Sequence, residues 1–501
     1  MNDVILGVDI GTTGTKAIAI NSQGEILASA YQGYNTYTDH NSWAEQDAMD
    51  WWDAVINTIR ECIQKEEIRQ CVKGIGLSSQ GGSLVPVDNQ GKPLRRAITW
   101  MDQRAAIQSI RFKENNPQDY FYRTTGWKLG NGLNAVQIRW LQENEPEIFR
   151  NTYKFLSTID FIIHQMTGEF YIDPSSAGIT QLMNFQEKVW DPTILKWLDI
   201  TKNYLPLIRD SGEIVGKIKP GIQEQLGLPG NVLVVTGAHD QYCAAVGAGV
   251  VESGDVLLAT GTAWVVLGIS DDIKPDVHSY LSQSRHAAEG KWGTMGTLGA
   301  AGKAMEWFKN NLGKTINNKD GGQTEEYGEI DRKVLDKPPG SNGLTFYPHF
   351  NGAPYPSRSS STKGTLLGLD LNHNRYDIAR ALMEGVAFDT RWMLETCFYK
   401  NSTNCNLIMT GGATQSQLWP QMIADVTGMP ILIPQVKHMA CLGAAIIAGK
   451  AIKWFPSIIE GSHRFAKGID RYDPNPVYKE QYQNLFQLYK ERKGRVTECY
   501  K

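Results

Sequence analysis

A short run of glycine and threonine near the start of the sequence could hold phosphate groups. Residues 11–14 read Gly-Thr-Thr-Gly and lie between Asp9 and Lys16. Because glycine has no Cβ, backbone N–H groups can approach a phosphate oxygen, and threonine hydroxyls add further donors. A carboxylate such as Asp9 can hold Mg²⁺ through water, and Lys16 can face a chain of phosphates. We predict a phosphate-binding hairpin here; an ordinary glycine-rich turn with an exposed lysine is the alternative.

A second run of the same kind occurs in the other half of the chain. Thr260-Gly261-Thr262 joins two short apolar stretches, residues 256–259 and 264–267. The first run likewise joins residues 4–10 to residues 16–20. Each unit is typical of two strands linked by a tight turn. We interpret the pair as a weak internal duplication.

A third candidate site centres on Asp240. The segment Gly-Ala-His-Asp-Gln, residues 237–241, lies where a predicted strand at 231–235 runs into a glycine- and alanine-rich helix at 240–250. Catalytic side chains are common at such junctions, and a carboxylate there could accept a proton from a hydroxyl group. The alternative is that Asp240 only caps the helix. We expect His239 to be a structural neighbour rather than a base.

The elements that carry these residues indicate an α/β protein. Hairpin-linked strands come first, and short apolar strands then alternate with amphipathic helices. A domain boundary is expected near residues 245–255, and the polar stretch at 317–333 is expected to be a surface loop or insertion. The clearest elements are strands at 25–30 and 72–77 and helices at 50–63, 376–394, 416–427, 440–452 and 477–489.

Composition excludes several classes of protein. The chain has 501 residues, a formal net charge of −3, 41% hydrophobic and 21% charged residues. This is ordinary for a globular protein of two large domains, and it excludes a disordered chain. No basic block predicts nucleic-acid binding, and no apolar run is long enough to span a membrane. Seven scattered cysteines form no CxxC pair, so neither a disulfide framework nor a zinc site is expected. We also expect a cytoplasmic protein.

Taken together, the motifs resemble those of the FGGY carbohydrate kinases, which share the actin/hexokinase/Hsp70 fold. The two glycine-threonine runs, the Asp240 segment and the late Gly-Gly-Ala-Thr at 411–414 match the phosphate-1, phosphate-2, catalytic and adenosine segments of that fold. Further segments resemble the family in the family's order, and the xylulokinase branch is the most similar. These segments are residues 43–47, 51–52, 100–104, 145–149, 364–369 and 377–384.

The resemblance implies two RNase H-like (actin-like ATPase) domains with a catalytic cleft between them. Residues 1–248 would bind the sugar and carry the phosphate-1 hairpin and the catalytic Asp240. Residues 249–501 would carry phosphate-2 and the adenosine pocket. The implied ATP-binding residues are Gly11, Thr12, Thr13, Lys16, Gly261, Thr262, Gly302, Glu306, Gly412, Ala413 and Ser416. Asp9 would position Mg²⁺, and the sugar would be surrounded by Gln80, Gly81, Gly82, Trp100, Asp102, Asp240 and Gln241.

The implied function is transfer of the γ-phosphate of ATP to a terminal hydroxyl of a small ketose or polyol, with Asp240 as general base. Two alternatives are a kinase for another alditol or a sugar acid, and a non-enzymatic actin-like or Hsp70-like ATP-binding protein. The expected partner is a small molecule, with neither nucleic acid nor membrane. A homodimer is one assembly that the sequence leaves open.

One departure from the xylulokinase pattern concerns the sugar. Where those enzymes have Gln-Met-His, this chain has Gln80-Gly81-Gly82. Loss of an imidazole and of a large apolar side chain is expected to leave more room and one directed hydrogen bond fewer. We therefore expect D-xylulose to be a poor substrate, unless Trp127 or Asn131 fills the space.

Overall fold

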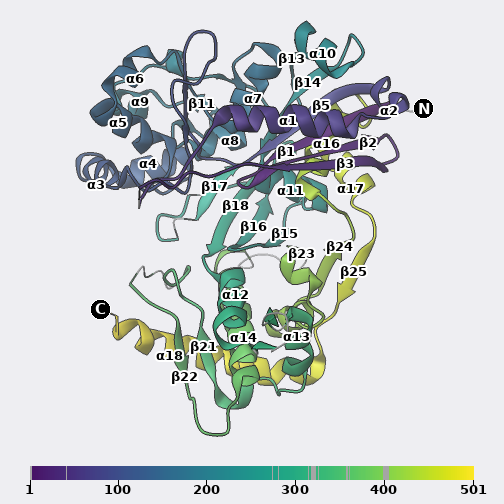
Figure 1. Cartoon of the computed structure of the whole chain (residues 1–501). Coiled ribbons are helices and arrows are strands. Elements are labelled where there is room, and N and C mark those ends of the chain that lie inside the picture. Colours follow the sequence, from purple (N-terminus) through teal and green to yellow (C-terminus); the bar gives the residue numbers. More distant parts are fainter. Residues whose placement is uncertain are drawn as a thin grey trace. The chain divides into compact units, whose positions relative to one another are not determined.

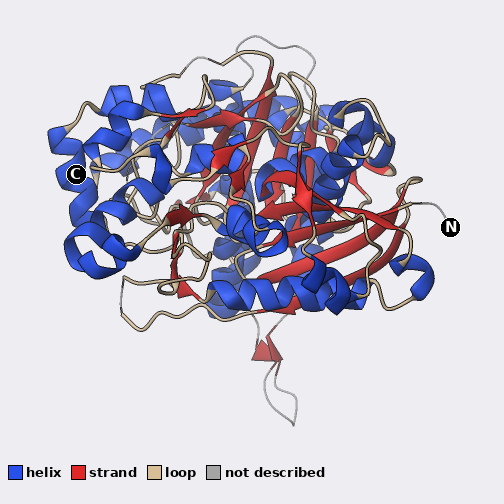
Figure 2. Cartoon of the chain, turned by 90° about the horizontal axis from the view of Figure 1, so that it is seen from above, coloured by secondary structure: helices blue, strands red, loops and turns tan. Residues whose placement is uncertain are grey.

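The computed structural model describes residues 3–40, 42–273, 275–279, 281–313, 315–316, 323–324, 326–356, 359, 361–398 and 406–500. Strands and helices alternate along it, drawn red and blue in Figure 2. The chain forms two compact units. Unit 1 comprises Met1–Ser253, Ile269–Thr294 and Val436–Lys467, and unit 2 comprises Gly254–Gly268, Met295–Gln435 and Gly468–Lys501.

Unit 1 is built on a six-stranded sheet ordered β13-β14-β5-β1-β2-β3. The predicted N-terminal hairpins form an antiparallel meander, and β5 and β14 are added parallel to β1. The carboxyl ends of β1, β5 and β14 therefore meet at one edge of the sheet. The strands are β1 (Val4–Ile10), β2 (Gly14–Asn21), β3 (Ile26–Gly33), β5 (Val72–Ser79), β13 (Ile214–Lys217) and β14 (Leu233–His239).

The alternation of residues in β1 explains how helices cover both faces of this sheet. Val4, Leu6 and Val8 point into a core shared with Trp51 of α1 (Ala48–Cys62). Gly7 points the other way, where a Cβ would overlap the backbone of α16 (Met439–Ala451). α16 lies on β1 and β5 beside α11 (Asp240–Ala248), although it comes late in the chain; Figure 1 shows this segment beside the purple N-terminal strands. The predicted division into residues 1–248 and 249–501 stays a prediction.

The remaining elements of unit 1 include several helices around a second apolar core. The helices at this core are α3 (Ala106–Asn115), α4 (Gln118–Thr125), α5 (Asn134–Asn144), α6 (Pro146–Asn151) and α9 (Pro192–Trp197). The other helices of unit 1 are α2 (Glu66–Arg69), α7 (Thr158–Thr167), α8 (Pro174–Ile179), α10 (Pro220–Leu226) and α17 (Ile458–Phe465). The short strands are β4 (Glu45–Gln46), β6 (Val85–Val87), β7 (Ala97–Ile98), β8 (Lys154–Leu156), β9 (Tyr171–Ile172), β10 (Met183–Asn184), β11 (Val189–Trp190) and β12 (Leu207–Ile208).

Unit 2 repeats the arrangement of β1, β2 and β5. β15 (Val256–Thr260) forms a hairpin with β16 (Trp264–Ser270) and pairs in parallel with β23 (Leu407–Gly411), which is followed by β24 (Ile431–Pro434) and β25 (Ile469–Tyr472). The helices are α12 (Ala301–Leu312), α13 (Tyr327–Leu335), α14 (Arg375–Cys397), α15 (Trp419–Thr427) and α18 (Lys479–Glu498). Its other strands are β19 (Thr315–Ile316), β20 (Gln323–Thr324), β21 (Thr345–Tyr347) and β22 (Thr365–Leu367). β17 (Ser282–Arg285) belongs to unit 1, and β18 (Trp292–Leu298) begins in unit 1 and ends in unit 2.

The stretch at 317–333 is only partly a loop. Residues 317–322 and 325 lie outside the described part of the chain, but α13 begins at Tyr327 and buries Ile330 and Val334. The prediction of a surface loop is therefore wrong for residues 327–333, because two apolar residues at helical spacing are enough to anchor this helix in the core of unit 2. No helix in the described ranges is both long and apolar enough to cross a bilayer.

A buried ion network ties α18 to α14. The carboxylate of Asp389 accepts a hydrogen bond from Lys493 Nζ at 2.9 Å and pairs with His349 Nε2 at 2.8 Å. All three side chains are buried. Burial alone would raise the pKa of Asp389, but the charges of Lys493 and His349 hold it well below its usual range. The C-terminal helix is thus anchored by charge as well as by the buried rings of Tyr482 and Phe486.

We predict that Lys493→Met destabilises unit 2 by about 3–5 kcal/mol, because it leaves the Asp389 carboxylate buried without its main cation. Urea unfolding followed by circular dichroism measures the change. Lys479→Met, an exposed lysine of the same helix, is the matched control. Equal stability of the two variants would contradict the prediction.

Candidate functional site

Two carboxylates lie at the shared edge of the sheet in unit 1. Asp9 is the penultimate residue of β1 and stands opposite Ser78 of β5 and Lys16 of β2. Asp240 follows β14 directly as the first residue of α11. β14 reaches this position through a bulge, where a Cβ at Gly237 would overlap the carbonyl oxygen of Leu77. The edge formed by the carboxyl ends of parallel strands is where α/β proteins place their ligands.

The two carboxylates interact electrostatically. Burial, together with the negative charge of Asp240, raises the pKa of Asp9 to about 6, against the lowering effects of the hydrogen bond from Ser78 and the charge of Lys16. Ser78 Oγ donates to Asp9 Oδ1 at 2.7 Å. Two carboxylates that repel each other at a sheet edge are suited to share a cation or to divide roles between them.

Asp240 does not act as a helix cap. The N-cap of α11 is His239, which makes no side-chain cap hydrogen bond, and Asp240 is the first helical residue. Oδ1 of Asp240 accepts no hydrogen bond from the described residues and lies 3.4 Å from His239 Nε2. The side chain is 27% exposed. The carboxylate is therefore anchored by its backbone and open to a reactant.

The glycine-threonine turn, residues 11–13, is held through its carbonyl oxygens. Tyr34 donates to Gly11 O, Gln46 donates to Thr12 O at 2.7 Å, and Tyr31 donates to Thr13 O at 3.2 Å. Lys16 is exposed, with its Nζ 5.9 Å from the centre of the Tyr31 ring. The turn is thus fixed from behind, and the Lys16 ammonium remains accessible to a ligand.

Two residues predicted to surround a sugar are hydrogen-bonded to this turn or to its support. Gln80 donates to Gln46 Oε1 at 2.9 Å, and Trp100, 45% exposed, donates to Thr12 Oγ1 at 3.3 Å. Oε1 of Gln80 and Oε1 of Gln241, a third predicted residue, are buried and accept no hydrogen bond from the described residues. Buried acceptors of this kind need donors, which a polyhydroxylated ligand supplies.

Asp102 lies nearby but is not open. Its Oδ2 accepts from Ala44 N at 2.6 Å and from Arg104 Nη2 at 2.8 Å, and its Oδ1 accepts from Arg104 N and Nε. Arg104 also pairs with Glu45, and both the Asp102 and the Arg104 side chains are 1% exposed. The structure therefore gives Asp102 a supporting position next to Trp100, and its contact with a sugar stays a prediction.

The expectation of extra room at Gly81 and Gly82 is wrong. A Cβ at residue 81 would lie 2.6 Å from His239 Cδ2 and 2.8 Å from Ile179 Cδ1. A Cβ at residue 82, where φ is +74°, would lie 2.7 Å from Leu133 Cδ2 and 3.1 Å from Trp100 Cβ. The nearest atoms belong to these four side chains, not to Trp127 or Asn131. Side chains from distant segments fill the space that two glycines leave.

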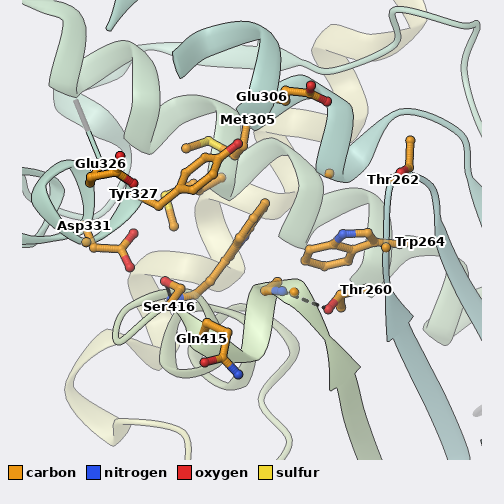
Figure 3. A pocket seen from close by; sticks show the side chains of 17 residues that line it. Thr260, Thr262, Trp264, Met305, Glu306, Glu326, Tyr327, Asp331, Gln415 and Ser416 are labelled. Carbon is orange, nitrogen blue, oxygen red and sulfur yellow. Dashed lines mark hydrogen bonds between the residues drawn. The ribbon is translucent and has the colours of Figure 1, made fainter. Parts of the chain in front are cut away.

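Unit 2 contains a pocket of about 460 Å³ at the equivalent sheet edge. Figure 3 shows Thr262 and Trp264 on one side of it and Asp331 and Ser416 on the other. Thr260 Oγ1 accepts from Ala413 N at 3.1 Å and so joins β15 to the turn after β23. All seven residues predicted in this half line the pocket: Gly261, Thr262, Gly302, Glu306, Gly412, Ala413 and Ser416.

The pocket also has walls that sequence reasoning missed. Trp264 and Trp419 pack with ring centres 4.8 Å apart, and Tyr327 and Asp331 come from α13. Burial raises the pKa of Asp331, and hydrogen bonds from Ser416 and the Gln417 backbone lower it. The two tryptophans belong to apolar stretches that are typical of a core, so only the helical spacing within 327–335 could have signalled part of this wall.

Comparison with known proteins matches this architecture. The model of the N-terminal domain of the FGGY family of carbohydrate kinases matches residues 4–247, and that of the C-terminal domain matches residues 256–452. Xylulose kinase of Bacillus subtilis (strain 168) is 29% identical over 97% of this chain and 96% of its own. Gluconokinase of the same organism is 28% identical over 89% of this chain and 87% of its own.

Comparison with solved structures also finds carbohydrate kinases. Ligand-bound xylulose kinase from Lactobacillus acidophilus superimposes with a TM-score of 0.92, at 26% identity over 99% of both chains. Gluconate kinase from the same organism gives a TM-score of 0.92, at 26% identity over 100% of this chain and 99% of that one. The predicted actin-like ATPase fold, with two sheet-containing domains, is confirmed. With both family models in order over most of its length, this chain belongs to the FGGY family of carbohydrate kinases, and it phosphorylates a sugar with ATP.

Proposed function

We propose that the chain transfers the γ-phosphate of ATP to a terminal hydroxyl of a small ketose or polyol, with Asp240 as the general base. The observation that carries this proposal is the pair of carboxylates, Asp9 and Asp240, at the sheet edge beside the glycine-threonine turn. One carboxylate can serve a cation while the other receives a proton, because their environments differ.

In the proposed step, Asp240 removes the proton from the sugar hydroxyl as its oxygen attacks the γ-phosphorus. A new O–P bond forms, the bond to the β–γ bridging oxygen breaks, and ADP leaves. The proton stays on the Asp240 carboxylate until it passes to water. In phosphoryl transfer most of the rate enhancement comes from positioning and from neutralising charge. Lys16 and the hairpin N–H groups supply that neutralisation in this proposal.

The proposed nucleotide site divides between the two halves of the chain. Gly302, Glu306, Gly412, Ala413 and Ser416 would line the adenosine part, since all of them line the unit 2 pocket. The phosphates would be held by the two hairpins, through Gly11, Thr12, Thr13 and Lys16 and through Gly261 and Thr262. Residues 1–248 would thus carry the sugar, the general base and part of the phosphate site, and residues 249–501 the adenosine part and the rest of the phosphate site.

The proposed magnesium site uses few protein ligands. No group of three or more His, Cys, Asp or Glu side chains that could hold a metal occurs in the described ranges. Mg²⁺ is commonly bound by one or two carboxylates together with water and substrate phosphates, so Asp9 beside the hairpin fits that role. When bound there, Mg²⁺ would neutralise the phosphate charge. Asp9 must lose its proton to take this role, and its pKa of about 6 allows that at neutral pH.

A neutral sugar fits the unit 1 cluster better than a sugar acid does. Gln80, Trp100 and Gln241 are uncharged, and the nearby Arg104 is committed to Asp102 and Glu45. A carboxylate buried among such groups would lack a cationic partner, which is costly. Because the space at Gly81 and Gly82 is filled, the reason to expect a large sugar disappears, and pentuloses stay among the candidates.

Asp240→Asn should lower kcat by about 10²–10⁴, because a positioned general base contributes that much. Sugar and ATP affinity should change little, since the amide has the same shape. ADP release at saturating substrates measures the effect, with Asp53→Asn, exposed on α1, as the control. Near-normal turnover of the Asp240 variant would exclude the proposed role.

Lys16→Ala should lower kcat/KM for ATP by roughly 10- to 100-fold, because a charge-assisted hydrogen bond contributes about 1.5–3 kcal/mol. Sugar binding, measured by calorimetry without nucleotide, should be unchanged. Lys65→Ala, at an exposed lysine before α2, is the matched control. Equal loss of affinity for sugar and ATP would count against the assignment.

Across a panel of pentuloses, hexuloses, alditols and aldonates, we expect kcat/KM for every aldonate to be roughly 100-fold or more below the best neutral substrate. ADP release coupled to NADH oxidation gives the values. If an aldonate had the highest kcat/KM of the panel, a cationic side chain would have to bind its carboxylate, and the preference for a neutral sugar would be wrong.

A further inference from the structure

We propose that His239 is a positioning and specificity-determining residue: its imidazole orients the Asp240 carboxylate and forms the wall of the sugar site over Gly81. This inference rests on the proposed role of Asp240. It adds a residue that neither the family membership nor the proposed reaction requires.

The backbone of His239 is held rigidly. It is the last residue of β14 and stands opposite Ser79 of β5 in the parallel ladder. Its N–H donates to Ser175 Oγ at 2.9 Å, and Ser175 Oγ in turn donates to Asp173 Oδ1 at 2.5 Å. Ser175 and Asp173 are buried. The start of α11 is therefore fixed to the rest of unit 1 through this residue.

The ring of His239 is confined on three sides. Its Cδ2 edge occupies the space above Gly81, where a Cβ would approach to 2.6 Å. Its Nε2 lies 3.4 Å from Asp240 Oδ1, and Tyr242 packs edge-on with ring centres 6.0 Å apart. No positive φ requires a glycine at residue 81, so the absence of a side chain there serves to admit the imidazole.

This placement matters because no described residue donates a hydrogen bond to Asp240 Oδ1. His239 Nε2 lies 3.4 Å from this oxygen, within ion-pair distance but without a hydrogen bond. In the proposal, this electrostatic contact and the backbone together set the orientation of the carboxylate. In the proposal, a proton on Nε2 attracts Oδ1 toward the ring and leaves Oδ2 to receive the proton of the sugar hydroxyl. The same ring forms the wall over Gly81 and so limits the shape of the sugar that reaches Asp240.

The test compares two replacements of His239. His239→Gln keeps an N–H donor near the position of Nε2, whereas His239→Leu keeps bulk without a donor. We expect Leu to lower kcat by roughly 10- to 100-fold, the usual effect of losing an orienting partner. Gln should restore most of that loss, and KM for ATP should stay unchanged in both. His463→Gln, exposed on α17, is the control, and thermal melting checks folding. Equal losses in the Gln and Leu variants, or no loss in either, would overturn the positioning role.

A double-mutant cycle tests the wall over Gly81. Gly81→Ala alone should lower kcat/KM for the sugar, because the new Cβ displaces the imidazole. In the His239→Ala background the same change should cost clearly less, because only the contact with Ile179 remains. Additive losses would overturn the proposed contact. If the unmodified chain releases no ADP with any sugar of the panel, the proposed function fails, whereas activity that is indifferent to His239 defeats only this inference.

Discussion

The architecture of unit 1 depends on close contact between helix backbones and a sheet that lacks side chains at the contact points. Gly7 of β1 and Gly76 of β5 form one row of the sheet, and a Cβ at either would overlap a carbonyl of α16. Gly443 of α16 meets α11 in the same way at Cys243. Because α16 lies directly on the strands and α11 lies directly on α16, the start of α11 has one position relative to the sheet. That constraint places Asp240 beside Asp9.

Once the carboxylates are placed, the polar groups around them follow from burial. A buried polar atom needs a partner, so the cluster of Gln46, Gln80 and Trp51 is hydrogen-bonded internally and supports the turn at Thr12. Ser78 partly compensates the burial of Asp9. Among the side chains expected to meet the sugar, Gln80 and Gln241 keep acceptors without a partner in the described residues. The residues that support the turn are thus held by hydrogen bonds, whereas the acceptors that would face a ligand have no hydrogen-bond partner among the described residues.

Sequence reasoning succeeded where chemistry is local and failed where distant segments meet. Hairpins, strand–helix junctions and glycine turns are encoded within a few residues, so the turn at 11–14 and the junction at Asp240 were predictable. The filling of the space at Gly81 was not, because His239 and Ile179 reach it through the tertiary fold. Likewise, nothing local shows that α16 packs on the N-terminal strands, since its alanines and glycines fit any tight helix contact.

The two hairpins have the same strand arrangement but carry different side chains. With Gly11 aligned to Gly261, the position of Asp9 is taken by Ala259. In the ladder, Lys16 pairs with Asp9, whereas Val265 pairs with Ala259. The unit 2 hairpin therefore offers a phosphate only backbone groups and hydroxyls, beside a pocket walled by aromatic rings. Of the two hairpins, only that of unit 1 has the charged pair needed for a cation and a phosphate chain. In the proposed reaction Asp240, also in unit 1, removes the proton. That reaction would therefore place the charged groups in one half of the chain and the pocket for the nucleotide base in the other.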